Sequence, residues 1–117
     1  MTDDRTVRLF AYGTLQQRDV QLANYGRPLD GTPDALAGYH LEDLTITDPE
    51  VVRLSGKAVH RIARETGDLA DQISGVVFRL TEAELAATDA YEVDVYARVE
   101  VRLESGTRAF VYVGSRA

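Results

Sequence analysis

The sequence predicts one α+β domain with a mixed or barrel-like sheet. Strand-like stretches outnumber helical ones, and the order is strand, short helix, several strands, helix and hairpin. No repeated strand–helix–strand pattern is present, which argues against a fully parallel sheet. The 117 residues correspond to one domain over 1–117, large enough to bury one core. With 44% hydrophobic and 27% charged residues, the composition is that of a globular protein.

The first predicted elements are a strand and a short helix. Residues 7–12 are rich in β-branched and aromatic types and stop at Gly13. Apolar residues on both faces near the end of this strand indicate a central position. A helix is expected over residues 19–25 with Asp19 as its cap, and residues 26–28 should end it. Its expected buried side is Val20, Leu22 and Ala23.

The middle of the chain has the weakest pattern. Residues 35–46 have a strand-like composition interrupted by Gly38, and residues 59–63 form another expected strand. Turns or loops are expected at 48–49, 55–56 and 66–68.

The last third is more regular. Residues 73–80 should form a strand that is broken or bulged at Gly75. Thr81 and Glu84 have the spacing of a capping box, which predicts a helix over residues 82–91. Finally, the alternating stretches at 96–103 and 108–113 flank a loop at 104–107 and predict a hairpin.

Charge and composition exclude several functions. The chain has 13 basic and 19 acidic residues and a net charge of −6, without a basic run, so neither nucleic acid nor an anionic membrane is an expected partner. It has no cysteine, which excludes disulfides, thiolate catalysis and iron–sulfur clusters. No apolar stretch approaches the ~20 residues of a membrane span, and the polar start is unlike a secretory signal. We expect a soluble cytoplasmic protein.

Common cofactor and catalytic motifs are also missing. The sequence has no GxGxxG, Walker A, GxSxG or HExxH motif. His40 and His60 are isolated and are interpreted as ordinary surface or strand residues. We therefore expect no metal and no cofactor.

The segment Tyr12-Gly13-Thr14-Leu15 directly follows the predicted central strand. Glycine there permits a tight turn and a close approach of ligand to backbone, and successive N–H groups can form an anion-binding concavity. The alternative is a plain strand-ending turn.

Glu92 is the strongest candidate for acid–base chemistry. Leu85, Asp89 and Glu92 share one stripe of the predicted helix, with Thr88 beside it, and Leu85 should face the core. A carboxyl group half-buried at a helix C-terminus should have a raised pKa, as a general acid or base requires. The alternative is that the helix ends at Ala90 and that Glu92 is a solvated loop residue.

Three stretches resemble one family. Residues 9–15 (LFAYGTL) are similar to the "F-x-YGTL" start of the γ-glutamylcyclotransferase-like, or AIG2-like, family. Residues 84–98 resemble its "EL…LDxYE…Y-x-R" stretch, and residues 109–113 (AFVYV) its closing strand. The chain departs from the usual pattern at Thr88 and Val93, and residues 48–64 do not align.

The resemblance implies a small mixed β-barrel flanked by a few helices, with a cavity for a γ-glutamyl group. It implies a catalytic Glu92. Substrate binding carries over onto Tyr12, Gly13, Thr14, Leu15 and Tyr112. The implied partner is a small γ-glutamyl amine or peptide.

The implied reaction is attack of the substrate's own α-amine on its γ-carbonyl, which expels an amine and leaves 5-oxoproline. This reaction needs no metal, cofactor or protein nucleophile, and positioning supplies much of the rate. Two alternatives stay open: a non-catalytic ligand-binding or regulatory module on the same fold, and a structural domain. The sequence specifies neither the leaving amine nor the oligomeric state.

Overall fold

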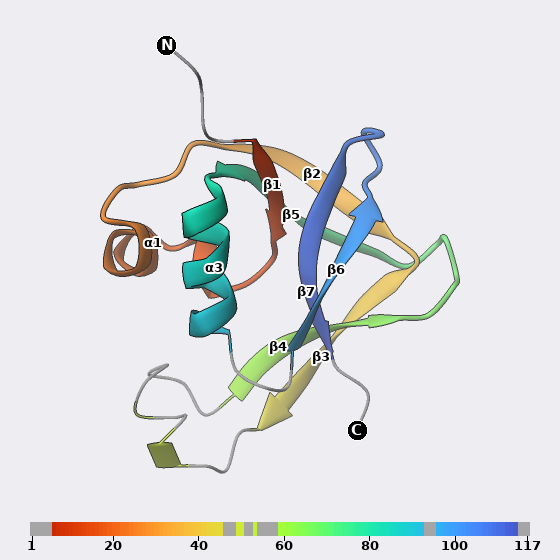
Figure 1. Ribbon diagram of the computed structural model, residues 1–117. Coiled ribbons are helices and arrows are strands. Elements are labelled where there is room, and N and C mark those ends of the chain that lie inside the picture. Colours follow the sequence, from red (N-terminus) through yellow and green to blue (C-terminus); the bar gives the residue numbers. More distant parts are fainter. Residues whose placement is uncertain (1–5, 46–48, 51–52, 54–58, 93–95, 115–117) are drawn as a thin grey trace.

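A computed structural model describes residues 6–45, 49–50, 53, 59–92 and 96–114 (Figure 1). The predicted turns at 48–49 and 55–56 lie partly or wholly outside the described residues. Among those residues, no helix is both long and apolar enough to cross a membrane.

Five strands form the main sheet, in the order β2-β5-β1-β7-β6. β1 is central, as predicted, and runs parallel to β7, whereas the other three pairings are antiparallel. The sheet is therefore mixed, and the predicted α+β class is confirmed. The strand bounds are Val7–Ala11 (β1), Gly31–Ala37 (β2), Gln72–Leu80 (β5), Tyr96–Arg102 (β6) and Arg108–Gly114 (β7).

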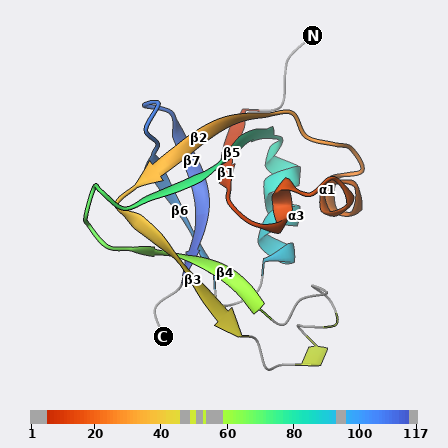
Figure 2. The ribbon, with the colours of Figure 1, turned by 180° about the vertical axis from the view of Figure 1, so that it is seen from behind.

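The remaining two strands form a separate antiparallel sheet, so the described strands do not close into the small barrel that the resemblance implied. β3 (Tyr39–Thr45) pairs with β4 (Val59–Glu65). Gly38, between β2 and β3, has a φ of 84°, a conformation that favours glycine. This turn directs β3 out of the main sheet, and the β3–β4 pair lies across one end of it (Figure 2).

The helices lie together beside the main sheet (Figure 1). A 3₁₀ turn, η1 (Thr14–Gln16), leads into α1 (Arg18–Tyr25), and α3 (Glu82–Tyr91) follows β5. The predicted capping box of α3 is confirmed: the Glu84 N–H donates to the Thr81 hydroxyl at 3.1 Å, and the Thr81 N–H donates to the Glu84 carboxylate at 2.9 Å.

The details predicted for α1 are only partly correct. Its N-cap is Gln17 rather than Asp19, and no side chain caps it. Of the predicted buried side, Val20 is partly buried against the core, but Leu22 and Ala23 are exposed and the fully buried residue is Gln21. The physical reason is that the Gln21 amide has partners on neighbouring backbone, which compensate for its burial.

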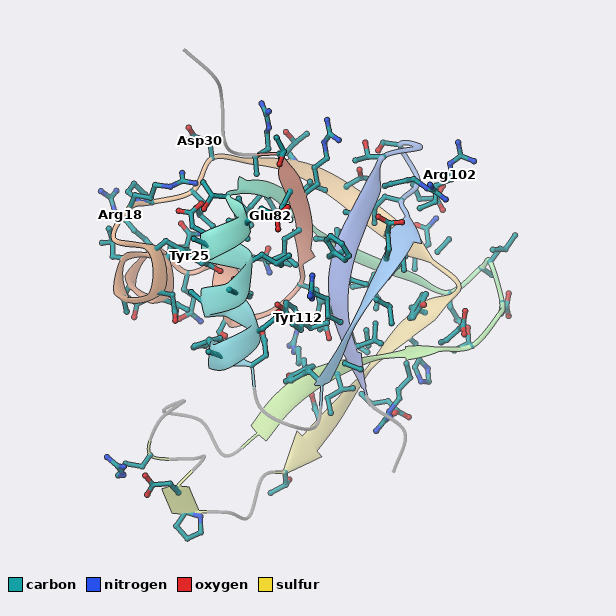
Figure 3. The ribbon with its side chains drawn as sticks, in the orientation of Figure 1. Arg18, Tyr25, Asp30, Glu82, Arg102 and Tyr112 are labelled. Carbon is teal, nitrogen blue, oxygen red and sulfur yellow. The ribbon has the colours of Figure 1, made fainter. Side chains whose placement is uncertain are left out.

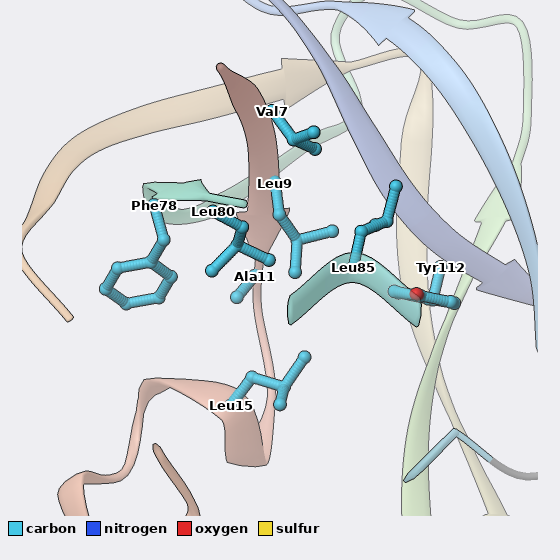
Figure 4. Close-up of a cluster of buried hydrophobic side chains, with 8 residues drawn as sticks. All are labelled: Val7, Leu9, Ala11, Leu15, Phe78, Leu80, Leu85 and Tyr112. Carbon is cyan, nitrogen blue, oxygen red and sulfur yellow. The ribbon is translucent and has the colours of Figure 1, made fainter. Parts of the chain in front are cut away.

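The core has two parts. One lies between the main sheet and the helices, where Leu85 of α3 lies beside the side chains of β1 (Figure 4). Its buried members are Val7, Leu9, Ala11, Leu15, Phe78, Leu80, Leu85 and Tyr112. The other contains Phe10, Leu36, Ala63, Ile73, Val77, Leu103, Ala109 and Val111, and so includes Ala63 of β4. The first cluster fixes α3 against β1.

Gly75 does not break β5, contrary to the prediction. The register continues through it, with Asp34 opposite Gly75 and Pro33 opposite Val76. A Cβ at Gly75 would lie 2.5 Å from the Ala11 carbonyl oxygen and 2.7 Å from the Phe10 ring. Glycine is needed here because two strands approach closely.

We expect Gly75→Ala to lower the free energy of unfolding by about 1–3 kcal/mol, because the methyl group would overpack against backbone. Urea denaturation followed by circular dichroism measures this change. Ser74→Ala, at the exposed neighbouring position, is the control and should change stability by less than about 0.5 kcal/mol. Equal effects of the two substitutions would contradict the close approach.

Candidate active site

The turn after β1 presents free backbone donors. Its carbonyl groups are used within the turn: Gln16 N–H donates to Gly13 O at 3.1 Å, and Gln17 N–H donates to Thr14 O at 2.9 Å. The N–H groups of Gly13, Thr14 and Leu15 have no acceptor within the described part of the chain. A Cβ at Gly13 would meet nothing within 4 Å. The turn can therefore accept an anionic or carbonyl oxygen close to its backbone.

The buried side chain of Gln21 holds this turn in place through two hydrogen bonds. Its amide nitrogen donates to Leu15 O at 2.9 Å, and its amide oxygen accepts from Leu29 N–H at 2.8 Å. The side chain of Leu15 is itself buried in the core. Only the backbone of Leu15 is thus available to a ligand. Sequence reasoning missed Gln21, because its position beside Val20 and Leu22 carries no signal of burial.

Glu92 occupies the C-cap of α3. The helix continues to Tyr91, and the Glu92 N–H donates to Thr88 O at 2.9 Å, so the alternative of a helix ending at Ala90 is wrong. Leu85 and Thr88 are buried, as the predicted stripe required. Glu92 is half-buried, and its carboxylate has no hydrogen bond or ion pair to any other described residue. Burial raises the pKa of Glu92 to about 7.

The turn and the end of α3 meet. Thr14 Oγ1 lies 2.8 Å from the Tyr91 hydroxyl, a hydrogen bond between positions 77 residues apart. Tyr91 directly precedes Glu92. The structure therefore brings together two segments that the sequence analysis treated separately, and Glu92 follows the contact residue immediately.

Five tyrosines lie near enough to Glu92 to be affected by its charge. In each, burial raises the phenol pKa, and the Glu92 charge raises it further. Tyr12 directly follows β1, the others come from α1, α3, β6 and β7, and two of the five are labelled in Figure 3. The five, which we call the tyrosine ring, are Tyr12, Tyr25, Tyr91, Tyr96 and Tyr112. Only Tyr12 and Tyr112 were predicted as site residues.

Two members of the ring attach β4 to the site. The Tyr12 hydroxyl donates to Tyr112 O at 2.5 Å and accepts from the Ala63 N–H at 3.1 Å. The Tyr96 hydroxyl donates to Arg61 O at 2.7 Å. The β3–β4 sheet is thereby held next to the turn and the end of α3. The Tyr12 proton is already engaged, so its hydroxyl has no proton to donate to a ligand.

Tyr112 belongs to a second network. It is 6% exposed, and its hydroxyl donates to Asp89 Oδ1 at 2.6 Å. Arg98 Nε contacts the same oxygen at 3.0 Å, and the guanidinium lies 4.8 Å from the centre of the Phe110 ring. Sequence reasoning placed Asp89 on the Glu92 stripe but gave neither Asp89 nor Arg98 a role.

The remaining candidates lie elsewhere. His40 is exposed and lies 3.4 Å from Glu42, as expected for a surface residue. The side chain of His60 is not described. A surface hollow of about 380 Å³ is lined by Glu100, Val101, Arg102 and Arg108, none of them a predicted site residue. The predicted cavity for a γ-glutamyl group stays a prediction.

We expect Glu92→Gln to stabilise the protein at alkaline pH. The pKa of Glu92 is raised from 4.5 to about 7 in the folded state, so the folded state binds more protons than the unfolded state between these values. Stability from this group is thus present at low pH and is lost as the pH rises toward 7. The difference in melting temperature, variant minus wild type, should grow between pH 5 and pH 8.

Glu82→Gln is the matched control, since Glu82 is an exposed carboxylate in the first turn of the same helix. The difference in melting temperature between Glu82→Gln and wild type should vary little between pH 5 and pH 8. A constant difference for Glu92→Gln as well would show that the Glu92 carboxyl is solvated.

Comparison with known proteins gives a fold and a family. A solution structure of a protein from Arabidopsis thaliana matches with a TM-score of 0.69 and 22% identity, over 97% of this chain and 65% of that one. A structure described as gamma-glutamyl cyclotransferase matches with a TM-score of 0.73 and 14% identity, over 94% and 67%. Allophanate hydrolase from Kluyveromyces lactis matches with a TM-score of 0.71 and 17% identity, over 94% of this chain but 17% of that one.

At these identities the structural matches show the fold alone, and the chain spans about two thirds of the length of the first two. A comparison with curated protein sequences found no match. The family model described as "Gamma-glutamyl cyclotransferase, AIG2-like" matches residues 9–116. This range begins on β1 and includes the turn, Glu92 and β7, and the chain therefore belongs to the AIG2-like gamma-glutamyl cyclotransferase family.

Proposed function

We propose that this protein releases 5-oxoproline from a γ-glutamyl amide, with Glu92 as general acid and base. One observation carries the proposal: a half-buried carboxylate without a partner among the described residues directly follows Tyr91, which contacts the turn that holds three free N–H groups. Membership of the family supports the reaction class. The substrate remains a small γ-glutamyl amine or peptide, with the leaving amine unspecified.

The reaction is an intramolecular acyl transfer. The substrate α-amine nitrogen forms a bond to the γ-carbonyl carbon, and the bond from that carbon to the leaving nitrogen breaks. Glu92 takes one proton from the α-ammonium and gives it to the leaving nitrogen, and the second proton that the attacking nitrogen loses on forming the lactam passes to the departing amine, which leaves as an ammonium. The carboxylate is thereby regenerated. A group with a pKa of about 7 suits both steps near neutral pH. Such proton transfer contributes about 10²–10⁴-fold to the rate.

The turn supplies the electrostatic part. The N–H groups of Gly13, Thr14 and Leu15 would hold the substrate α-carboxylate or the oxyanion that develops on the γ-carbonyl. The open space at Gly13 suits close approach of the substrate. Holding the α-amine next to the γ-carbonyl would accelerate the reaction, because the two groups belong to one molecule and need only the correct bound conformation to react.

The tyrosines have a different part in this proposal. The Tyr12 and Tyr112 hydroxyl protons are already bound to Tyr112 O and Asp89, so these residues would contact substrate through their rings. The rings would also exclude water from Glu92. We retain both as substrate-binding residues on this basis.

A cytoplasmic location is part of the same proposal, and a chain without cysteine is compatible with a reducing compartment.

A second candidate is a non-catalytic binding or regulatory module. The match to allophanate hydrolase favours keeping it, because the same fold there makes up a minor part of a larger protein. The two functions differ in one readout. A binding module would show a raised melting temperature with a γ-glutamyl ligand and no product, whereas an enzyme would form 5-oxoproline.

We expect purified protein to release 5-oxoproline from at least one member of a panel of γ-glutamyl amides and peptides. Glu92→Gln should lower kcat at least 100-fold, because the amide cannot carry the proton. Chromatographic detection of 5-oxoproline measures both.

Glu82→Gln is the control, and it should retain wild-type turnover. Circular dichroism of each variant checks that the fold is intact. Absence of 5-oxoproline across the whole panel would contradict the enzyme, and full activity of folded Glu92→Gln would contradict the role of Glu92.

A further inference from the structure

Glu92 lies among groups that could stabilise its anion, yet none of those that the structure describes makes a hydrogen bond or ion pair with it. Each hydroxyl of the tyrosine ring has a partner other than Glu92. The Thr88 hydroxyl donates to Glu84 O at 2.8 Å, so the Tyr25 hydroxyl, 2.6 Å from Thr88 Oγ1, must donate to it. The hydroxyls of the ring therefore bind other groups and not Glu92. Such an arrangement requires residues that hold the donors elsewhere.

Asp89 holds two of these donors at once. It lies one helical turn before Glu92, at the i and i+3 positions of neighbours on one face. Its Oδ1 accepts from the Tyr112 hydroxyl at 2.6 Å and from Arg98 Nε at 3.0 Å. Both donors come from the strand pair β6–β7, in which Arg98 and Tyr112 stand directly opposite each other.

Of the two donors that Asp89 holds, Arg98 would have the larger effect on the Glu92 pKa, because it carries a positive charge. Its charge and that of Glu92 both act on the Tyr112 phenol, so both side chains reach the same neighbourhood. An arginine that paired with Glu92 would lower the pKa of the carboxyl by about 1–3 units and weaken it as a base. Instead, the guanidinium is held by Asp89 and stacked on Phe110.

The other charged groups near Glu92 do not replace Arg98. On α3, Glu84 is paired with Arg27 at 2.8 Å. On α1, Asp19 is acidic and acts on Tyr91. On β4, Arg64 pairs with Glu42 at 2.9 Å, and Arg61 is exposed and gives its carbonyl to Tyr96. Among the described residues, the other groups that the Glu92 charge acts on are the phenols of the tyrosine ring.

We propose that Asp89 is a positioning residue that holds Arg98 and Tyr112 away from Glu92, and so keeps the acid–base carboxylate free of a charged or hydroxyl partner. This inference rests on the proposed function for its purpose. Whether Arg98 and Tyr112 bind Asp89 in place of Glu92 can be tested without measuring enzymatic turnover.

The test compares Asp89→Ala with Asp89→Asn by NMR titration of the Glu92 side-chain carboxyl. Both substitutions remove the negative charge, but asparagine keeps an oxygen that can accept from Tyr112 and Arg98. We expect the Glu92 pKa in Asp89→Ala to lie about one unit below that in Asp89→Asn, a tenfold loss of proton affinity. The double variant Asp89→Ala/Arg98→Gln should recover the part of this difference that Arg98 causes, and the Tyr112 hydroxyl, which is released in both alanine variants, should account for the rest. Equal titration of the alanine and asparagine variants would overturn the proposal.

Arg98→Gln in the otherwise unchanged protein keeps the proposal falsifiable if Asp89→Ala fails to fold. Here the Glu92 pKa should change by less than about half a unit, because Arg98 binds Asp89 rather than Glu92. A rise of a unit or more would show that Arg98 already stabilises the Glu92 anion and would overturn the proposal.

Turnover separates this inference from the proposed function. If 5-oxoproline is never released but the titrations differ as expected, the positioning role stands and the enzymatic function fails. If the protein is active, the acid limb of kcat/KM should move to lower pH in Asp89→Ala relative to Asp89→Asn. An active protein whose acid limb is the same in both variants would overturn the positioning role alone.

Discussion

The contact between the turn after β1 and the C-terminal end of α3 is the constraint on which the site depends. Packing of Leu85 in the β1 core fixes the helix beside the strand, and the Thr14–Tyr91 hydrogen bond joins their ends. The free backbone donors of the turn and the Glu92 carboxylate are useful to one substrate only while these ends stay together. The site is therefore a product of core packing as much as of its own residues.

The second constraint is the satisfaction of the tyrosine hydroxyls. A phenol brought close to a carboxylate would normally donate to it and lower its pKa. Here the hydroxyls donate to or pair with backbone carbonyls, threonines and Asp89 instead. The same bonds that attach β4 to the main sheet and α1 to α3 thus also leave Glu92 without a hydrogen-bond donor among the described residues. Fold stability and the protonation of Glu92 are coupled through these side chains.

Some local sequence signals predicted local structure correctly, whereas others, such as the Asp19 cap of α1, did not. The capping box of α3 and the glycine between β2 and β3 were readable because each depends on residues close in sequence. The sequence could not show whether the sheet closes, because closure depends on which strand β3 pairs with. In the structure β3 pairs with β4 in a separate sheet. Glu92 was found because a helical projection reaches the end of one element. Partners that join separate elements, such as Asp89 and Tyr112, leave no such trace.

The fold therefore limits the chemistry without determining it. A scaffold that recurs within allophanate hydrolase can serve more than one purpose, and the difference must lie in the few side chains at the junction of the turn and α3. A half-buried Glu92 without a partner would be a cost to folding at neutral pH, since its ionisation opposes burial. A pure binding module could remove this cost with a glutamine, whereas proton transfer requires the carboxyl group. The presence of the costly residue at this position is the physical argument for catalysis.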